Sequence, residues 1–452
     1  FSAVMTYDYD LFIMGAGSAG AAAASKAASL GLRVAVAEQE ALGGTCLNRG
    51  CIPKKLIVYA ADFALHNKIA PDYGWSKSSS HFDWTQFIRS VHKQIERINN
   101  SYQEKFEKSG IELIRGHATF VDAHTIKVNE RQVTADKILI AVGARPLIPD
   151  IPGIEYAITS REMFHLPYLP KRLAIIGGGY IGVEFASMMN ALGCRVTVID
   201  TSETVLEGFD DDIRKTLQES LSKRGIKFIN NSTATEIKHY EEGWLLTVSG
   251  KYKKTIAADS ILVATGRAPN TEKLDLDNAQ VEMGEKNAIK VDEYSRTNQE
   301  NIFAVGDCTN RLQLTPAAKS EAVAFVNTVF ANRPETVNYD EIPSAVFARP
   351  EMASMGMTVE QARSEFGDSV KCYSNKFQPL MHQLASSEEQ VIIKVVVEGE
   401  SERVIGIHML GEHAADIIQC LGVAIRKGIT KQDLDEAIAI HPTTAEEFLT
   451  LD

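Results

Sequence analysis

The sequence of 452 residues predicts an α/β protein in which two similar strand-helix-strand domains, one inserted in the other, precede a C-terminal α+β domain. A glycine motif that occurs twice between a strand and a helix predicts the two similar domains. Short apolar strands after each copy predict the insertion, and two apolar runs near the C-terminus predict the last domain. A chain of this length is too long for one core, and roughly 150 residues per domain suggests about three domains.

The two copies of the glycine motif match in all their parts. A strand over Asp10–Met14 precedes the first copy, and a strand over Leu173–Ile176 precedes the second. Their glycines and the acidic residues that follow at equal distances are Gly15, Gly17, Gly20 and Glu38, and Gly177, Gly179, Gly182 and Asp200. Such glycines allow a tight turn and let a pyrophosphate approach a helix N-terminus closely. The carboxylate accepts hydrogen bonds from the ribose hydroxyl groups. One copy alone could be a mere tight turn, but two matched copies predict two Rossmann-like dinucleotide-binding domains.

Apolar strands mark where these domains end. Ile138–Gly143 and Ile261–Gly266 each close one unit, and a third such strand, Ile302–Asp307, follows the second unit. The first domain is therefore expected to resume after the second. Beyond Val337 the runs Gln390–Val397 and Arg403–His408 predict paired strands flanked by helices. The predicted domains are residues 5–145 (first dinucleotide-binding domain), 146–268 (second), 269–336 (continuation of the first, central domain) and 337–452 (C-terminal α+β domain).

Composition excludes several classes of partner. The chain has 47 basic and 59 acidic residues, a formal net charge of -12, and no block of Lys and Arg, so no nucleic-acid partner is expected. No apolar run is long enough to cross a bilayer, so no membrane partner is expected either. A cytoplasmic location follows as the default expectation.

Among six cysteines only Cys46 and Cys51 are close in sequence, with four residues between them. A disulfide that closes so short a loop adds little chain-entropy stabilisation and can be reopened at modest cost. A nearby helix N-terminus would stabilise a thiolate here. The alternatives are two structural thiols or half of a metal site. Metal sites favour closer cysteine pairs with a second pair or histidines, which are absent, so no metal is expected and the pair is predicted to be redox-active.

The segment Gly43–Lys55 around these cysteines resembles the active-site disulfide of the pyridine nucleotide-disulfide oxidoreductases, and the resemblance extends from Tyr7 to Leu451. It implies that hydride from a nicotinamide cofactor passes through FAD to the cysteine pair, which reduces a small disulfide substrate. It also implies that residues 5–145 form the FAD-binding domain, residues 146–268 the NAD(P)-binding domain and residues 337–452 a dimerisation (interface) domain. Several stretches, including Phe377–His382, are most similar to the glutathione reductase branch.

The resemblance assigns roles to individual residues. Cys51 would lie next to the flavin, Cys46 would attack the substrate, and Lys54 would pair with Glu184 near the flavin. The residues implied for FAD are Gly15, Gly17, Gly20, Glu38, Gly44, Thr45 and Asp307. Those implied for the nicotinamide dinucleotide are Gly177, Gly179, Gly182 and Asp200, and further cofactor-binding candidates are Gly143, Gly266 and Arg267.

His441 is the candidate acid-base. Disulfide exchange needs a group that accepts and returns a proton, and imidazole titrates in the right range. His441 and Glu446 resemble the family's His-Pro-x-x-x-Glu signature, in which the pair serves the disulfide of the other subunit, so a homodimer with shared active sites is expected. Tyr102 matches a tyrosine at the substrate site, whereas His408 and His413 match no motif and are expected to be structural.

Two departures concern specificity. Ser25 and Val323 stand where glutathione reductases have arginines for the substrate carboxylates, and Lys26 or Lys319 could compensate. Thr201 and Glu207 stand where arginines hold the 2′-phosphate of NADPH, so NADH is expected to be preferred, although Arg195 could make NADPH possible. Dihydrolipoamide dehydrogenase and a nucleotide-binding redox sensor without turnover are the alternative functions.

Overall fold

The computed structural model describes residues 6–76, 81–251, 253–385 and 387–451. The predicted domain limits at Met5 and Asp452 lie outside these residues. The chain forms two compact units, which comprise residues 1–54, 85–147 and 266–339, and residues 55–84, 148–265 and 340–452.

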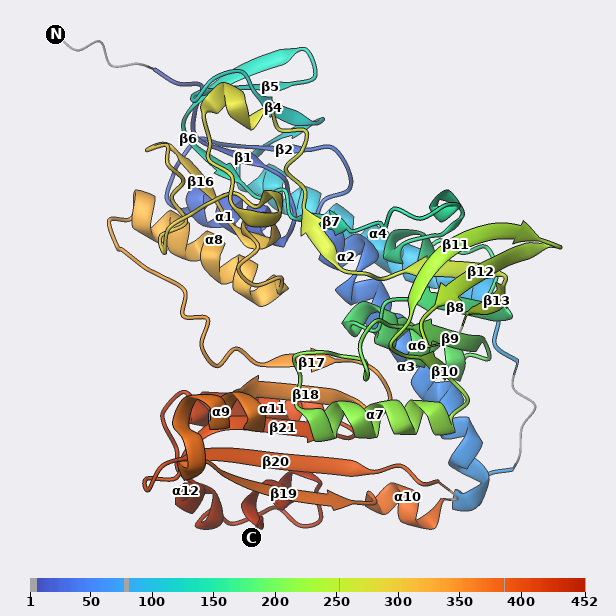
Figure 1. The fold of residues 1–452 in the computed structure, drawn as a ribbon. Coiled ribbons are helices and arrows are strands. Elements are labelled where there is room, and N and C mark those ends of the chain that lie inside the picture. The colour runs from blue at the N-terminus through green and yellow to red at the C-terminus, as the bar shows by residue number, and fades with distance from the viewer. Residues whose placement is uncertain (1–5, 77–80, 252, 386, 452) are drawn as a thin grey trace. The chain divides into compact units, whose positions relative to one another are not determined.

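A mostly parallel sheet forms the first unit (Figure 1). Its strands are β1 (Tyr9–Met14), β2 (Val34–Glu38), β3 (Glu112–Arg115), β4 (Ala118–Phe120), β5 (Thr125–Val128), β6 (Arg131–Ile140) and β16 (Ile302–Ala304). The end of β6 lies between β1 and β16 and is parallel to both, while its start pairs antiparallel with β5. Because β16 follows the second glycine motif in sequence, its place in this sheet confirms that the first domain resumes after an insertion.

The helices of this unit are α1 (Ser18–Ser29), α2 (Gly44–Arg49), the start of α3 (Cys51–Ile69), most of α4 (Trp84–Lys108) and α8 (Thr315–Phe330). Of these, α1, α8 and the end of α4 share an apolar core with the sheet. Five of the buried residues of α1 are alanines, and α1 packs against α8 (Figure 1). Small side chains permit this close approach of the two helices. Two short strands, β7 (Ala144–Pro146) and β15 (Arg267–Pro269), pair antiparallel at the points where the chain leaves and re-enters the unit.

The second unit contains a parallel sheet that repeats the first motif. Its strand order is β10-β9-β8-β14, with an adjoining antiparallel sheet in the order β11-β12-β13. These strands are β8 (Arg172–Ile176), β9 (Arg195–Ile199), β10 (Lys227–Ile229), β11 (Thr233–Tyr240), β12 (Gly243–Ser249), β13 (Lys254–Ala258) and β14 (Ser260–Val263). The helices of this part are α5 (Ser160–Met163), α6 (Tyr180–Ala191) and α7 (Asp211–Lys223).

The C-terminal part of the second unit is an antiparallel sheet in the order β17-β18-β21-β20-β19. Its strands are β17 (Ser344–Val346), β18 (Met352–Gly356), β19 (Lys371–Phe377), β20 (Val391–Glu398) and β21 (Arg403–Leu410). The helices are α9 (Val359–Phe366), α10 (Leu380–Leu384), α11 (Ala414–Ile425) and α12 (Lys431–Asp435). The two predicted strands are thus β20 and β21, which pair directly. The predicted fold class is confirmed.

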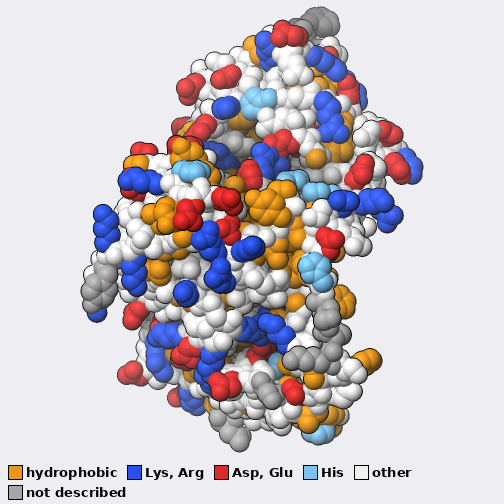
Figure 2. All heavy atoms as spheres, turned by 90° about the vertical axis from the view of Figure 1, so that its right-hand side faces the viewer, with side chains coloured by type: hydrophobic (Ala, Val, Ile, Leu, Met, Phe, Trp, Pro, Cys, Tyr) orange, Lys and Arg blue, Asp and Glu red, His pale blue; other side chains and the backbone are white. Residues whose placement is uncertain are grey.

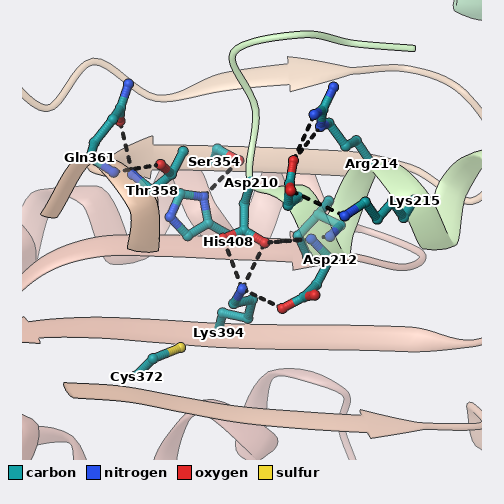
Figure 3. Close-up of polar contacts among 12 residues, drawn as sticks. Asp210, Asp212, Arg214, Lys215, Ser354, Thr358, Gln361, Cys372, Lys394 and His408 are labelled. Carbon is teal, nitrogen blue, oxygen red and sulfur yellow. Dashed lines mark hydrogen bonds and ion pairs between the residues drawn. The ribbon is translucent and has the colours of Figure 1, made fainter. Parts of the chain in front are cut away.

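A buried polar cluster connects α7 to this sheet (Figure 3). The ammonium of Lys394 on β20 lies 2.8 Å from both carboxylate oxygens of Asp210 and 2.7 Å from Asp212. Asp210 is also the N-cap of α7 and accepts the backbone N–H groups of Asp212 and Ile213. His408 is buried beside the cluster, and its two ring nitrogens contact Ser354 and the Met357 carbonyl, in agreement with a structural role.

The surface carries charges of both signs. On the face that Figure 2 shows, basic and acidic side chains are intermixed. Among the described residues, no helix combines the length and the apolar character that a membrane span requires.

Candidate active site

The two glycine turns have the same close packing. A Cβ atom added to Gly20 would overlap the carbonyl oxygen of Gly15, and one added to Gly182 would overlap that of Gly177. Each helix can therefore lie directly against the turn before it only because these residues lack a side chain.

The helix N-termini at these turns are suited to phosphate groups. α1 begins after Gly17 and α6 begins after Gly179, in both cases without a side-chain cap and without an acidic residue in the first turn. Backbone N–H groups at such helix ends can bind a pyrophosphate, and the helix dipole favours its negative charge.

The acidic residues of both motifs lie beside the turns. The Glu38 carboxylate accepts hydrogen bonds from the backbone N–H groups of Ala16 and Glu40, each with an N···O distance of 2.8 Å. The Asp200 carboxylate accepts the N–H of Gly178 and, at 2.7 Å, that of Ser202. Each carboxylate is thus held at the end of the second strand of its unit, where a ribose would extend from a bound pyrophosphate.

Further residues of the first unit fit a bound dinucleotide. Gly44 lies against the first turn, since a Cβ atom on Gly44 would come within 2.7 Å of the Gly17 Cα atom, and Thr45 follows it in α2. Arg267 lies 3.1 Å from Asp307, whose pKa is raised by burial although Arg267 opposes this shift. Within the part of the chain that the structure describes, the buried Nε atom of Arg267 has no hydrogen-bond partner. An orphaned buried donor indicates a polar ligand, so this edge of the unit fits FAD.

The predicted cysteines lie at two helix starts in the first unit. Cys46 is in the short helix α2, and Cys51 is the first residue of α3. Both are free thiols that share a hydrogen bond. The Cys51 Sγ atom lies 3.9 Å from the hydroxyl of Thr315 at the start of α8.

The cysteine pair holds one proton far more tightly than the other. The pKa of Cys46 is lowered to about 6, mainly because the Cys51 thiol donates a hydrogen bond to it, and further because of Thr315 and the charge of Lys319. The same interaction raises the pKa of Cys51. Near neutral pH, Cys46 is therefore the thiolate and Cys51 the thiol, and a thiolate is the more nucleophilic form.

Two asparagines position the loop between the cysteines. The Asn48 amide donates to the carbonyl groups of Leu42 and Gly44 at 2.8 and 2.9 Å, and its oxygen accepts from Asn99 on α4 at 2.8 Å. Tyr102, one turn further along α4, packs against the apolar core of this unit. The sequence reasoning missed Asn48, Asn99 and the role of Thr315, and only the position of Thr315 before a proline at a helix start offered a signal.

His441 and Glu446 form a pair in the second unit. The Nδ1 atom of His441 lies 3.1 Å from a Glu446 carboxylate oxygen, and Glu446 also accepts the Thr443 N–H at 3.0 Å. These two hydrogen bonds, that from Thr443 first, lower the pKa of Glu446. The His441 side chain is 81% exposed, so the ring stays accessible while its Nδ1 atom is held by Glu446.

The two residues of the predicted ion pair lie in different units. Lys54 is in the first turn of α3 in the first unit, and Glu184 is on α6 in the second. Glu184 is buried and accepts the Phe347 N–H at 2.8 Å. Its pairing with Lys54 stays a prediction.

Comparison with known sequences identifies this combination of sites. Residues 9–322 match the family described as pyridine nucleotide-disulphide oxidoreductase, and residues 342–451 match its dimerisation domain. The chain belongs to the pyridine nucleotide-disulphide oxidoreductase family. It is an oxidoreductase flavoprotein that acts on a disulfide, in a family that uses FAD and NAD(P)H.

Relatives match this chain over nearly its whole length. A glutathione reductase of Nostoc sp. is 46% identical, over 99% of this chain and 100% of that protein. One from Burkholderia cepacia is 41% identical over 98% of each chain. Among solved structures, the HOCl-induced flavoprotein disulfide reductase RclA from Escherichia coli gives a TM-score of 0.88 at 29% identity, covering 98% of this chain and 99% of that one. These relatives do not favour dihydrolipoamide dehydrogenase.

Proposed function

We propose that this chain is a homodimeric, FAD-dependent disulfide reductase of the glutathione reductase type that prefers NADH and reduces a small disulfide. The observation that carries this proposal is the cysteine pair, in which Cys46 is a thiolate near neutral pH and Cys51 stays protonated beside it. The full-length similarity to glutathione reductases supports the choice of substrate class.

The residues of the first unit are proposed to hold FAD. Its pyrophosphate would lie at the turn before α1, and its ribose at Glu38. The set consists of Gly15, Gly17, Gly20, Glu38, Gly44, Thr45, Gly143, Gly266, Arg267 and Asp307. When bound, FAD supplies the redox link between the nicotinamide cofactor and the cysteine pair.

The cysteines and His441 are proposed to carry out the exchange. The Cys46 thiolate attacks one substrate sulfur, and a mixed disulfide forms as the other sulfur leaves as a thiolate and takes a proton from His441. Cys51 then gives its proton to the now neutral His441 and attacks the Cys46 sulfur, which forms the Cys46–Cys51 disulfide. The second substrate sulfur leaves as a thiolate and takes that proton from His441. Glu446, which holds the Nδ1 atom of His441, keeps the Nε2 atom directed outward.

A panel of disulfides tests the proposed activity. We expect the holoenzyme with NADH to reduce glutathione disulfide faster than lipoamide, and Cys46→Ser and Cys51→Ser to be inactive. Steady-state kcat/KM values measured for both substrates check this. A higher kcat/KM for lipoamide would contradict the glutathione reductase type, and an absence of turnover with any disulfide would contradict the enzyme assignment.

The proposed preference for NADH rests on charge. The carboxylate of Asp200 lies beside the second glycine turn, and Ser202 donates a hydrogen bond to Glu207 at 3.1 Å. Thr201, Glu203 and Glu207 are exposed in the same segment. A 2′-phosphate placed beside these acidic groups would be repelled, whereas ribose hydroxyls can donate to Asp200.

The nearby arginines do not offset these acidic groups. Arg195 is the first residue of β9, about 15 Å along the strand from Asp200. Arg214 on α7 is paired with Asp211 at 2.7 Å and donates to the Thr204 carbonyl at 3.1 Å. Arg195 is thus distant from Asp200, and Arg214 is already paired.

Exchange of the acidic residues tests the preference. We expect kcat/KM for NADH to exceed that for NADPH by about tenfold or more, in line with loss of a charge-assisted contact and added repulsion. The variant Asp200→Ala/Thr201→Arg/Glu207→Arg should shift the ratio toward NADPH. The control Arg195→Gln should leave the ratio unchanged. A preference of the unmodified enzyme for NADPH that Arg195→Gln removes would refute the charge argument.

A further inference from the structure

One face of α8 extends from the cysteine pair to the surface. Thr315, Lys319 and Val323 are spaced four residues apart, which places them on one face of the helix. Lys319 and Val323 are exposed, while the opposite face is buried through Ala318, Ala322 and other residues. Because Thr315 contacts Cys51, Lys319 lies one turn away from the cysteine pair on the same face.

Lys319 lies one turn beyond Thr315 on α8, and its charge acts on the Cys46 thiol. After the hydrogen bonds from Cys51 and Thr315, the charge of Lys319 is a further cause of the lowered pKa of Cys46. Lys319 forms no ion pair among the residues that the structure describes. The acidic residue two positions further, Glu321, is buried and already bound by Arg311 at 3.0 Å and by the Tyr339 hydroxyl at 2.6 Å.

Lys26 is the other residue that could replace the carboxylate-binding arginines, but its charge acts on a different group. It lies in the last turn of α1. Its charge contributes to the lowered pKa of Glu335, after hydrogen bonds from Asn327 and Arg333. The charge of Lys26 therefore acts on Glu335, whereas that of Lys319 acts on Cys46.

We propose that Lys319 is a specificity-determining residue of the disulfide site, which binds a carboxylate of the substrate close to the sulfur that Cys46 attacks. This inference rests on the proposed function. A flexible, exposed ammonium can follow a carboxylate several bonds away from a sulfur. The formal net charge of -12 repels acidic substrates in general, so a local cation at the thiolate has more effect on their binding.

Lys319 could act by binding the substrate or by lowering the pKa of Cys46. Two disulfide substrates that differ in charge distinguish these two roles. A change in Cys46 basicity alters the rate with every disulfide, whereas carboxylate binding alters the rate only with acidic ones. Glutathione disulfide and its fully amidated counterpart are therefore compared with the holoenzyme at saturating NADH. The variants are Lys319→Gln, Lys319→Arg and, as a matched control on α1, Lys26→Gln.

We expect Lys319→Gln to lower the ratio of the two kcat/KM values, acidic over amidated, by about fivefold through KM, as for a partly exposed ion pair. Lys319→Arg should retain most of the ratio, and Lys26→Gln should leave it within about twofold. Higher ionic strength should lower the ratio in the unmodified enzyme more than in Lys319→Gln.

Equal losses with both disulfides would overturn the inference, because they would show that Lys319 acts on the thiol alone. Turnover of both disulfides with an unchanged ratio in Lys319→Gln would overturn it as well, while leaving the proposed function intact. If the unmodified enzyme reduces neither disulfide, the proposed function fails and the inference fails with it.

Discussion

The chemistry of Cys46 depends mainly on one neighbouring thiol. Its pKa of about 6 arises mainly from the hydrogen bond that Cys51 donates, while burial acts in the opposite direction. Reactivity should therefore be present above pH 6 and lost as the pH falls through about 6, because the thiolate is the nucleophile.

Alkylation kinetics test this pKa. In the reduced holoenzyme, we expect the rate of Cys46 alkylation by iodoacetamide to be half-maximal near pH 6. Cys51→Ala should shift the midpoint up toward the ordinary value of 9, because the hydrogen bond is lost while burial remains. Cys372→Ala, which removes a thiol on β19, serves as the control. A midpoint that stays near 6 in Cys51→Ala would show that another group stabilises the thiolate.

At the scale of single residues, the sequence could predict only sites whose parts are adjacent. Cys46 and Cys51 form a recognisable pair because four residues separate them. The contact between Cys51 and Thr315 joins positions 264 residues apart, and that between Asn48 and Asn99 joins positions 51 apart. Such contacts depend on how α8 and α4 pack, which no local pattern specifies.

The glycine turns are the elements on which both nucleotide sites depend. We expect Gly20→Ala to be purified with little FAD, because the new Cβ atom must displace α1 from the Gly15 carbonyl. Gly182→Ala should retain FAD and show a raised KM for NADH. Overpacking of this kind costs about 1–3 kcal/mol, or roughly 5- to 150-fold in affinity. Each variant is the control of the other, and a loss of FAD in Gly182→Ala would argue against two separate sites.

In the C-terminal sheet, apolar runs were enough to predict two strands but not the ion pair that one of them carries. The apolar runs predicted β20 and β21 because both are buried. Lys394 interrupts the run on β20, yet it is as buried as its neighbours, with a side chain that is 4% exposed. Its partner Asp210 is 184 positions away in sequence, so the ion pair could not be read from the strand itself.

This buried pair provides a test of how α7 is held (Figure 3). We expect Lys394→Met to lower the free energy of unfolding by about 3 kcal/mol, because the Asp210 carboxylate stays buried without its cation. Lys394→Met/Asp210→Asn should be more stable than the single variant, since the charge is removed while the oxygen that caps α7 remains. Urea denaturation checks both. Equal stability of the two variants would show that Asp210 does not need Lys394.

At the scale of the whole molecule, the residues proposed to carry out disulfide exchange come from both units of the chain. Cys46 and Cys51 belong to the first unit, and His441 and Glu446 belong to the second. The region before His441 exposes large apolar side chains, with Ile438 98% and Ile440 79% exposed. Apolar side chains of this size mark an interaction surface, and the chain has the family's dimerisation domain. These observations favour a dimer, and we propose that in it His441 of one subunit serves Cys46 of the other.

Mixing of two inactive variants tests the shared site. Cys46→Ser lacks the nucleophile and His441→Ala lacks the acid-base, so each homodimer should be nearly inactive. In a heterodimer, the intact Cys46 of one subunit would meet the intact His441 of the other, which restores one of two sites. Random exchange makes half of the dimers heterodimers, so we expect about a quarter of the unmodified activity. Mixing Cys46→Ser with a Cys46→Ser/His441→Ala subunit is the control, which should stay inactive. If subunit exchange is demonstrated by mass labelling and no activity returns, the active site is contained within one chain.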